Sequence, residues 1–233
     1  MKHLGCIIAC FVILLNVHLV NAQGDVKIGT QVWTSKNLDV STFRNGEAIP
    51  EAKNAEEWAK VSENEKPAFC YYNFDTINRK VYGKLYNWYA VNDPRGLAPY
   101  GWHIPDDSEW TELIEILGGE DLAAIKLKSN TGWSEIVGEK IAGFKMSAKD
   151  GWKKGKKSGN GNNKSGFNGV PGGCMNDGEY FELTKTAYWW SSKQWDTGLA
   201  WCRYIDNDCF GQSHVVSKRV NESNFLSVRC IKD

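Results

Sequence analysis

The strongest candidate for ligand chemistry in this sequence is an aromatic residue next to an acidic one. Trp195 and Asp196 lie in the polar stretch 193–198, between two apolar segments. A tryptophan ring in such surroundings can stack on the apolar face of a sugar or on a peptide, and the neighbouring carboxylate can accept hydrogen bonds. We therefore predict a binding site around Trp195. The alternative is that its ring only closes the hydrophobic core.

Two other polar segments supply further candidate ligands. Residues 176–180 join the site if the loops cluster in space, and residues 206–208 form an oxygen-rich turn. Such oxygens suit a hard cation such as calcium, but the tip of a hairpin explains the same residues. We predict neither a metal nor a cofactor. The predicted ligand-binding residues are Trp195, Asp196, Asn176, Asp177, Tyr180, Asp206, Asn207 and Asp208.

The cysteines form an odd set once an N-terminal export signal, residues 1–22, is set aside. Two of the seven cysteines lie in that segment, and an odd remainder leaves at least one thiol free or paired between chains. The sequence contains no Cys-x-x-Cys or His-x-x-x-His spacing, which argues against a metal site. The predicted disulfides are Cys202 with Cys209, across a tight turn, and Cys70 with Cys230.

A catalytic constellation is hard to assemble. His103 lies beside Asp106, Asp107 and Ser108, which are residue types found in catalytic triads. These residues share one short segment, however, and they are needed to cap a helix, while no nucleophile-elbow motif occurs. We therefore interpret His103 as a hydrogen-bonded structural residue and predict that the chain is not an enzyme.

The same segment contains the clearest helix start. Pro105 bars the helix from extending backwards, and Asp106 with Glu109 can form a capping box. Apolar residues then recur at helical spacing from Trp110 onward, until two glycines stop the run. We expect this amphipathic helix to anchor the scaffold. The predicted structural residues are Trp102, His103, Asp106, Glu109, Trp110, Trp189 and Trp190.

The other expected elements are short. Before and after the capped helix we expect a strand pair at 26–38, a loop or short surface helix at 44–66, a strand at 67–72, a buried helix at 85–91 and a helix at 122–127. Residues 153–166 are expected to form a mobile loop. Strands are expected at 167–170, 180–183, 187–191, 199–205, 210–216 and 225–231. Helices in the middle and strands at both ends indicate an α+β fold with an antiparallel sheet.

Composition and the N-terminus narrow the class of protein. Residues 1–22 combine a positive start, an apolar run and small residues before a cleavage point, which predicts a signal peptide. Lipidation at Cys10 is the alternative, although it leaves too short an apolar run. Residues 23–233 are then one secreted or cell-envelope domain. Acidic and basic residues balance at 28 each, which argues against nucleic acid, and no later segment reads as a membrane span.

Short motifs spread over residues 26–233 carry a family resemblance. They include Val32-Trp33 with Asn37-Leu38, Cys70-Tyr71-Tyr72-Asn73, Tyr82-Gly83-Lys84-Leu85-Tyr86-Asn87-Trp88, Gly101-Trp102-His103-Ile104-Pro105, Pro171-Gly172-Gly173, Tyr188-Trp189-Trp190-Ser191-Ser192 and Ser227-Val228-Arg229-Cys230. Through these motifs the chain resembles the Fibrobacter succinogenes major paralogous domain family, whose members are exported proteins of Fibrobacter and Bacteroidetes.

The resemblance implies an α+β fold of the C-type-lectin-like and formylglycine-generating-enzyme-like kind. In that fold two short helices flank small twisted antiparallel sheets, and long loops carry the binding surface. With the signal peptide and without a catalytic constellation, this architecture leads us to expect an exported, non-catalytic domain of a Gram-negative bacterium, in the periplasm or on the outer surface, that binds a glycan or a cell-surface protein. The alternatives are an enzyme, either an oxidase of the formylglycine-generating kind or a glycan-modifying one, and a purely structural envelope protein.

The chain departs from the family pattern at its cysteines. Cys174 stands where an aromatic residue is expected, and Cys202 and Cys209 stand where the family has other residues. This member is therefore expected to have its own disulfide near the binding loops. The calcium triplets of lectins, Glu-Pro-Asn and Gln-Pro-Asp, do not occur.

Overall fold

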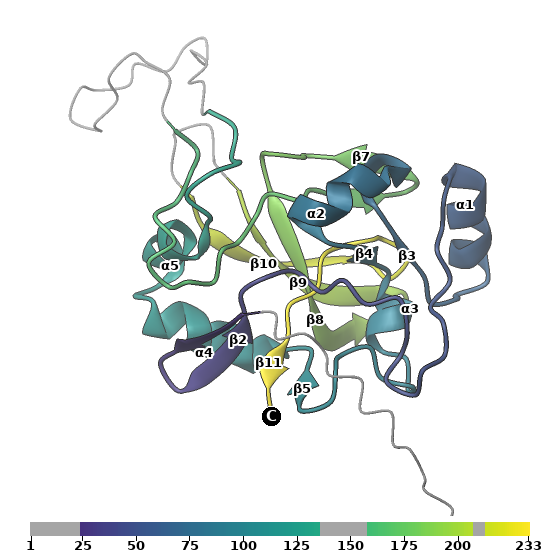
Figure 1. The fold of residues 1–233 in the computed structure, drawn as a ribbon, viewed down its shortest axis with the longest axis horizontal. Helices are drawn as coiled ribbons and strands as arrows, with labels where there is room; N and C mark the ends of the chain where they lie inside the picture. The colour runs from purple at the N-terminus through teal and green to yellow at the C-terminus, as the bar shows by residue number, and fades with distance from the viewer. Residues whose placement is uncertain (1–23, 136–157, 207–212) are drawn as a thin grey trace, which may run out of the picture.

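The computed structural model describes residues 24–135, 158–206 and 213–233, and it shows a mixed α and β fold with small antiparallel sheets and few helices (Figure 1). The strands are β1 (Asp25–Ile28), β2 (Gln31–Thr34), β3 (Phe69–Cys70), β4 (Leu85–Tyr86), β5 (Trp102–His103), β6 (Cys174–Asn176), β7 (Glu179–Phe181), β8 (Ala187–Asp196), β9 (Leu199–Ile205), β10 (Val215–Asn221) and β11 (Ile231–Lys232). The helices are α1 (Ala55–Glu63), α2 (Arg79–Tyr82), α3 (Trp88–Val91), α4 (Asp107–Ile116) and α5 (Glu120–Leu127), with 3-10 turns η1 (Tyr72–Phe74) and η2 (Thr76–Asn78). The predicted signal segment lies outside the described residues.

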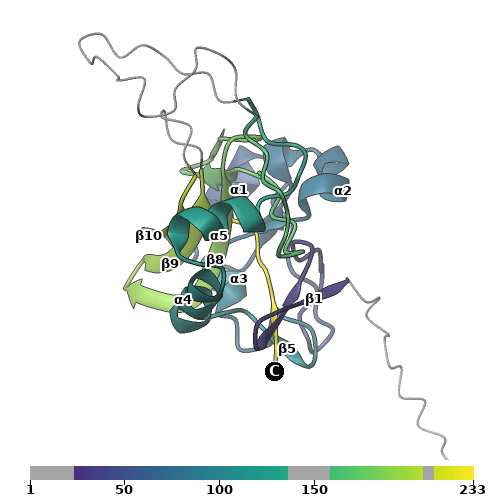
Figure 2. The same ribbon diagram turned by 90° about the vertical axis from the view of Figure 1, so that its left-hand side faces the viewer.

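The strands form two main sheets and two small two-stranded sheets. One sheet has the order β1-β2-β11-β5, so the C-terminal strand pairs between two strands from the first half of the chain. The other has the order β10-β9-β8 and lies at the centre of the molecule in Figure 1. Helix α4 packs on β8 and α5 packs on β10, and both helices lie beside this sheet in Figure 2. Within the described residues, no helix has the length and apolar character needed to cross a bilayer.

Helix α4 begins with the capping box that the sequence predicts. The Asp106 carboxylate accepts hydrogen bonds from the backbone amides of Ser108 and Glu109, and the Glu109 carboxylate accepts one from the amide of Asp106 at 2.9 Å. These bonds satisfy amides that no earlier turn of the helix can satisfy. Trp110 and Leu113 then point into the core and are almost completely buried.

An aromatic cluster joins α4 to both main sheets. The Trp33 ring lies 4.8 Å from that of Trp110, and the Phe167 ring lies 5.4 Å from that of Trp189, with the planes of this second pair close to perpendicular. All four side chains are essentially fully buried. Edge-to-face contacts of this kind add to the stabilisation that burial alone provides. The cluster therefore fixes the strand β8 that later carries Trp195.

Asn37, just after β2, is a hydrogen-bonding hub in the core. Its side-chain oxygen accepts bonds from Trp189 Nε1 at 2.9 Å and from Arg229 Nε at 2.8 Å. Its side-chain nitrogen donates to the carbonyl of Tyr82 at 2.9 Å and to Ser227 Oγ at 3.0 Å. One buried amide thus connects four separate parts of the chain with its full hydrogen-bonding capacity.

The buried guanidinium of Arg229 extends this hub. Nη1 donates to the carbonyls of Thr34 and Phe167, at 2.6 and 2.9 Å, and Nη2 donates to that of Asn168 at 3.0 Å. The guanidinium also lies 4.3 Å from the centre of the Phe167 ring. Neutral carbonyl oxygens, rather than a carboxylate, therefore solvate this buried cation.

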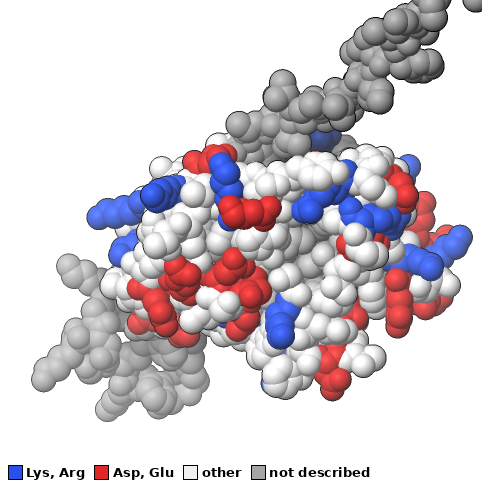
Figure 3. Space-filling model, turned by 90° about the horizontal axis from the view of Figure 1, so that it is seen from below, with Lys and Arg blue, Asp and Glu red and all other residues white. Residues whose placement is uncertain are grey.

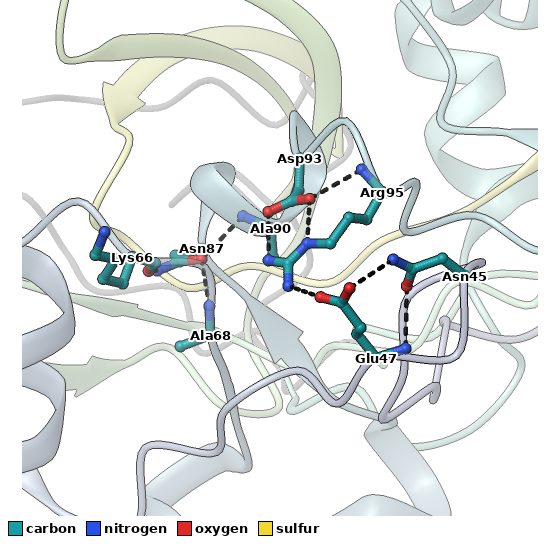
Figure 4. Close-up of polar contacts among 8 residues, drawn as sticks. All are labelled: Asn45, Glu47, Lys66, Ala68, Asn87, Ala90, Asp93 and Arg95. Atoms are coloured by element: carbon teal, nitrogen blue, oxygen red, sulfur yellow. Dashed lines mark hydrogen bonds and ion pairs between the residues drawn. The ribbon is translucent and has the colours of Figure 1, made fainter.

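A second asparagine, Asn87, interrupts the segment 85–91, where a single helix was expected. Asn87 accepts hydrogen bonds from the amides of Ala90 and Ala68, at 3.1 and 2.9 Å, and donates to the carbonyl of Lys66 at 2.7 Å (Figure 4). It therefore caps α3 while also holding the approach to β3. The expected single helix is wrong: the segment divides into β4 and the short helix α3 on either side of Asn87.

Several other strands begin or end at residues different from those expected from the sequence, because tertiary contacts determine their bounds. The structure contains a hairpin, β6–β7, of which only the second strand was expected, and β8 extends five residues beyond the expected end at Ser191. No strand forms at 167–170, where Gly169 makes only an isolated bridge. Strand β10 starts at Val215, later than expected, and part of the predicted loop at 153–166 lies outside the described residues. The expected pairs β1–β2 and the strand β9 are present.

Replacing Asn37 by leucine should destabilise the fold strongly. The substitution keeps the approximate volume but leaves buried groups of Trp189, Arg229, Tyr82 and Ser227 without a partner. Each orphaned group costs about 1–3 kcal/mol, so we expect the free energy of unfolding to fall by at least about 3 kcal/mol. Urea denaturation measures this change. The exposed Asn92→Leu variant is the control and should stay within about 0.5 kcal/mol of the parent; equal effects at both positions contradict the hub.

Candidate functional site

A cavity of about 370 Å³ lies where the predicted residues Asn176 and Asp177 face the three-stranded sheet. Its lining comes from the β6–β7 hairpin, from β8, β9 and β10, and from the segment after β10. The lining is mixed in character. Its polar members are Asn176, Asp177, Glu182, Lys218, Arg219, Asn221 and Asn224.

A tight turn positions the hairpin at this cavity. Asn176 pairs with Glu179, which leaves Asp177 and Gly178 as a two-residue loop, and both have positive φ, 49° and 81°. Such a loop is the type I′ geometry that Asp-Gly favours. A Cβ on Gly178 would lie 2.9 Å from the ring of Trp58 in α1, so only glycine lets the helix pack this closely. The turn is therefore fixed both by the pairing of β6 with β7 and by its packing against Trp58 of α1.

A tyrosine and a glutamate form another wall of the cavity. The Tyr188 hydroxyl donates to Glu182 Oε2 at 2.6 Å, and the Tyr188 ring stacks on that of Tyr204 at 5.5 Å. Burial, together with this bond to Glu182, raises the pKa of Tyr188. The hydroxyl therefore stays protonated and orients the carboxylate, whose other oxygen can accept a bond from a ligand.

Asn224, in the lining of the same cavity, has an unsatisfied acceptor. The residue is 5 % exposed, and its Oδ1 atom is buried without a hydrogen-bond partner among the described residues. A buried polar atom in this state is uncommon in folded proteins and costs about 1–3 kcal/mol. Because this oxygen has essentially no accessible surface, it lies behind the lining of the cavity.

Trp195 forms an exposed platform on the three-stranded sheet. Its residue surface is 50 % exposed, and its ring lies 5.1 Å from that of Trp201, nearly perpendicular to it. The guanidinium of Arg219 lies 4.7 Å from the Trp195 ring centre and 5.7 Å from that of Trp201. Arg219 also lines the cavity and is the one residue that the two features share. Side chains alternate along β9 and β10, so Trp201 and Arg219 lie on the sheet face opposite to Cys202 and Lys218. We call Trp195, Trp201 and Arg219 the tryptophan platform.

The platform owes its position to an irregularity in β8. The pairing of β8 with β9 is regular from Ala187 to Trp190 and then shifts before Gln194. A bulge of this kind bends a strand and re-aims the side chains beyond it. The buried part of β8 therefore holds the core, and the exposed part beyond the bulge presents Trp195.

Two predicted binding residues, Tyr180 and Asp196, do not line the cavity. Tyr180 points away from the cavity: its hydroxyl donates to the carbonyl of Tyr71 at 3.0 Å, and its ring packs 4.8 Å from that of Tyr72. Side chains alternate along a strand, so its neighbour Phe181, 40 % exposed, lines the cavity instead. The Asp196 carboxylate accepts a bond from the amide of Thr197 in the turn at the end of β8.

Asp206 is the one described residue of the acidic turn predicted at residues 206–208, and it does not lie beside Trp195. Asp206 follows the last residue of β9, whereas the Trp195 end of the hairpin leads into its first residue, Leu199. Seven strand residues span about 20 Å, which separates the two ends. Asn207 and Asp208 lie outside the described residues. Within the described part of the chain, no group of three or more His, Cys, Asp and Glu side chains could hold a metal ion.

The predicted disulfide between Cys70 and Cys230 does not form, because the two thiols pack in different core clusters. Cys70 packs with Met175 and Phe225 and receives a hydrogen bond from the Tyr180 hydroxyl at 3.6 Å, whereas Cys230 belongs to the larger cluster around Trp190. Cys202 is also a free buried thiol, and its predicted partner Cys209 lies outside the described residues. Burial raises the pKa of Cys70, Cys174, Cys202 and Cys230 to about 12 in each case.

His103 lies in β5, away from the cavity, and bridges two carboxylates. Nδ1 is 2.7 Å from Asp233 Oδ1, and Nε2 is 2.8 Å from Glu109 Oε1, the residue whose other oxygen completes the α4 cap. Burial opposes the charged form, but the hydrogen bonds to Asp233 and Glu109 outweigh it and raise the pKa of His103. The imidazolium form of His103 can donate from both ring nitrogens, so contacts with two carboxylates favour the protonated form over the neutral one. His103 thus ties the C-terminal residues to the start of α4.

Acidic side chains gather over α4 on the face shown in Figure 3. Asp107, Glu112 and Glu115 line a shallow hollow there, with Lys193 from β8 at its border. Arg203, buried in β9, places Nη1 2.6 Å from Asp107 Oδ1. This ion pair ties the first turn of the helix to the strand that carries Trp201.

Some residues of the site were not expected from the sequence. Trp201, Arg219, Phe181 and Asn224 all contribute to the platform or the cavity. The Asp177-Gly178 dipeptide was the one local signal of the hairpin that brings Phe181 to the cavity. Arg219 and Asn224 carry no local signal, because only the pairing of β10 with β9 places Arg219 opposite Trp201.

The mixed α and β fold, with its small antiparallel sheets, can now be compared with known families. The family model described as the Fibrobacter succinogenes major domain matches residues 26–232, and the chain belongs to this family. The comparison with curated proteins and the comparison with solved structures each found no match. The family resemblance inferred from the sequence is therefore confirmed.

The bridge at His103 predicts a pH-dependent stability. Because the pKa of His103 is raised in the folded state, its stabilisation is fully present below its unfolded pKa of about 6.5 and is lost as the pH rises through the folded pKa. We expect the difference in unfolding free energy between the parent and His103→Gln to be larger at pH about 5.5 than at pH about 8.5. Chemical denaturation at both pH values measures it, and comparison with the variant cancels other titrating groups. A difference that does not change with pH contradicts this role.

Proposed function

We propose that this chain is a non-catalytic carbohydrate-binding domain whose site combines the tryptophan platform with the adjoining cavity. The observation that carries the proposal is the half-exposed Trp195 ring, held against Trp201 and Arg219, with Arg219 also in the lining of the cavity. An aromatic ring stacks on the apolar face of a sugar, and nearby polar groups bind the hydroxyls.

The chemistry of the cavity favours a neutral, hydroxyl-rich ligand. Lys218 and Arg219 supply donors, whereas Glu182 supplies an acceptor, so both roles of a sugar hydroxyl are matched. The volume of about 370 Å³ lies at the small end of ligand pockets, which suits a short oligosaccharide segment rather than a long polymer. Phe181, partly exposed in the wall, offers a second apolar surface.

The described thiols and histidines support a binding role rather than catalysis. Thiols with a pKa of about 12 stay protonated at neutral pH, and a protonated thiol is a poor nucleophile. His103 is engaged on both nitrogens by carboxylates that belong to the scaffold. Cys174 lines the cavity, but burial raises the pKa of its thiol to about 12 as well, and His103 is not part of the lining. A purely binding function needs no such group.

The proposal includes a location and a finer fold assignment. The signal-like residues 1–22 suggest that the domain acts in the periplasm or at the cell surface, where glycans and cell-surface proteins are the available ligands. Small antiparallel sheets with a binding surface on hairpins and loops are consistent with a C-type-lectin-like arrangement. Both parts of the proposal follow from the sequence and need their own tests.

A glycan array with the purified domain tests the binding function. We expect a restricted set of oligosaccharides to bind, and we expect Trp195→Ala to weaken that binding at least about tenfold, since an interfacial tryptophan contributes about 2 kcal/mol or more. Tyr100→Ala is the matched control: Tyr100 is 77 % exposed and also lies against an arginine, Arg44, at 5.4 Å.

Three outcomes decide the proposal. Loss of binding in Trp195→Ala with full binding in Tyr100→Ala supports the platform. Equal binding by both variants removes Trp195 from the site. Absence of any glycan binding by the parent, while it stays folded by circular dichroism, contradicts the carbohydrate function and leaves a protein ligand for the same platform.

A further inference from the structure

A second hollow, of about 660 Å³, lies on a different part of the molecule and is dominated by cations. Its lining comes from the segment after β2, from η2 and α2, and from residues 168–170. The cations are Lys36, Arg79, Lys80 and Arg229. We call this hollow the basic cleft.

The basic cleft is not neutralised by its own acidic residue. Asp39 is the one carboxylate in its lining, and it already binds Arg79 Nε at 2.7 Å and the buried Lys84 Nζ at 2.9 Å. Lys36 and Lys80 are exposed and make no ion pair within the described residues. The cleft therefore keeps an excess of positive charge, which attracts anions.

Arg229 adds a buried charge to the wall of the cleft. Its side chain is fully buried, and its described hydrogen bonds all go to neutral oxygens, those of Thr34, Asn37, Phe167 and Asn168. Burial lowers the pKa of Arg229 to about 9, which reflects the cost of keeping the cation away from water. A ligand of opposite charge in the cleft would offset this cost.

Neutral donors complete the surroundings of the basic cleft. Thr76, Tyr71 and Asn168 are part of its lining. Hydroxyl and amide groups can donate to the oxygens of an anion whose charge is balanced by the cations. Lysines suit phosphate-like groups as point charges, because they need no fixed fork geometry.

We propose that the basic cleft binds a multiply charged oxyanion, a phosphate or sulfate group, with Lys36 and Lys80 as its direct contacts and Arg229 as the buried charge behind them. The site is separate in residues from the tryptophan platform and does not depend on the carbohydrate function. A group with two negative charges is favoured over a single carboxylate, since several cations lack a partner of their own.

Calorimetric titration of the intact domain with inorganic phosphate and with sulfate tests the proposal. Sodium chloride at equal ionic strength is the control for general screening, and acetate is the singly charged control. We expect phosphate or sulfate to bind with a measurable heat and to raise the melting temperature, because a ligand that binds only the folded state stabilises it. Acetate should bind at least about tenfold more weakly.

The double variant Lys36→Ala/Lys80→Ala should lose at least about tenfold in affinity for the oxyanion. Both side chains are exposed, so the fold should be retained, and circular dichroism checks this. The matched control is Lys53→Ala/Lys60→Ala, which removes two exposed lysines near α1 and changes the net charge equally. Trp195→Ala should keep full oxyanion binding, which separates this site from the platform.

The results that overturn the proposal are equally definite. The proposal is wrong if neither phosphate nor sulfate has an effect beyond that of chloride. It is also wrong if the Lys36/Lys80 variant binds as well as the parent, or if the Lys53/Lys60 control loses as much affinity. Equal binding of acetate would contradict the preference for a multiply charged group.

Discussion

The fold depends on a guanidinium buried without a carboxylate. Arg229 is solvated by oxygens from the end of β2, from Asn37 and from residues 167–168, so these segments must converge on one point for the cation to be tolerated in the core. Asn37 links this group of residues to β8, because its side-chain oxygen also accepts a hydrogen bond from Trp189. Since β8 carries Trp195 beyond its bulge, the same network that satisfies the buried charge also positions the proposed binding surface.

The molecule thus has a buried frame, the hydrogen-bonded core around Asn37, Trp189 and Arg229, and exposed surfaces that this frame supports. The hub residues Asn37, Trp189 and Arg229 all belong to the motifs that indicate the family, and all three are buried. The tryptophan platform and the exposed lysines of the basic cleft lie outside that hub. Membership of the family therefore identifies the buried hub, whereas the proposed binding surfaces consist of side chains outside that hub. This separation explains why a firm family assignment gives little information about function.

Short sequence patterns correctly predicted those helices and strands whose formation depends on neighbouring residues. The capping box of Asp106 and Glu109 and the strand β9 were predictable because neighbouring residues determine them. Asn87 was misread because its amide bonds both to α3 and to residues distant in the sequence. Tyr180 was predicted to join the binding site, but alternation along β7 turns its side chain toward Tyr71 and Tyr72 and brings Phe181 to the cavity instead. Arg219 and Asn224 reach the site only through strand pairing and the packing of distant segments, which no local pattern encodes.

The central claim is that the exposed tryptophans bind the ligand while the buried ones form the frame. The most direct measurement is a titration of the ¹⁵N-labelled domain, in which the indole N–H signals are followed while the strongest oligosaccharide from the array is added. The account predicts that the signals of Trp195 and Trp201 shift with saturation, while those of the buried Trp33, Trp189 and Trp190 stay in place. Saturable binding that leaves the Trp195 and Trp201 signals unmoved would contradict it.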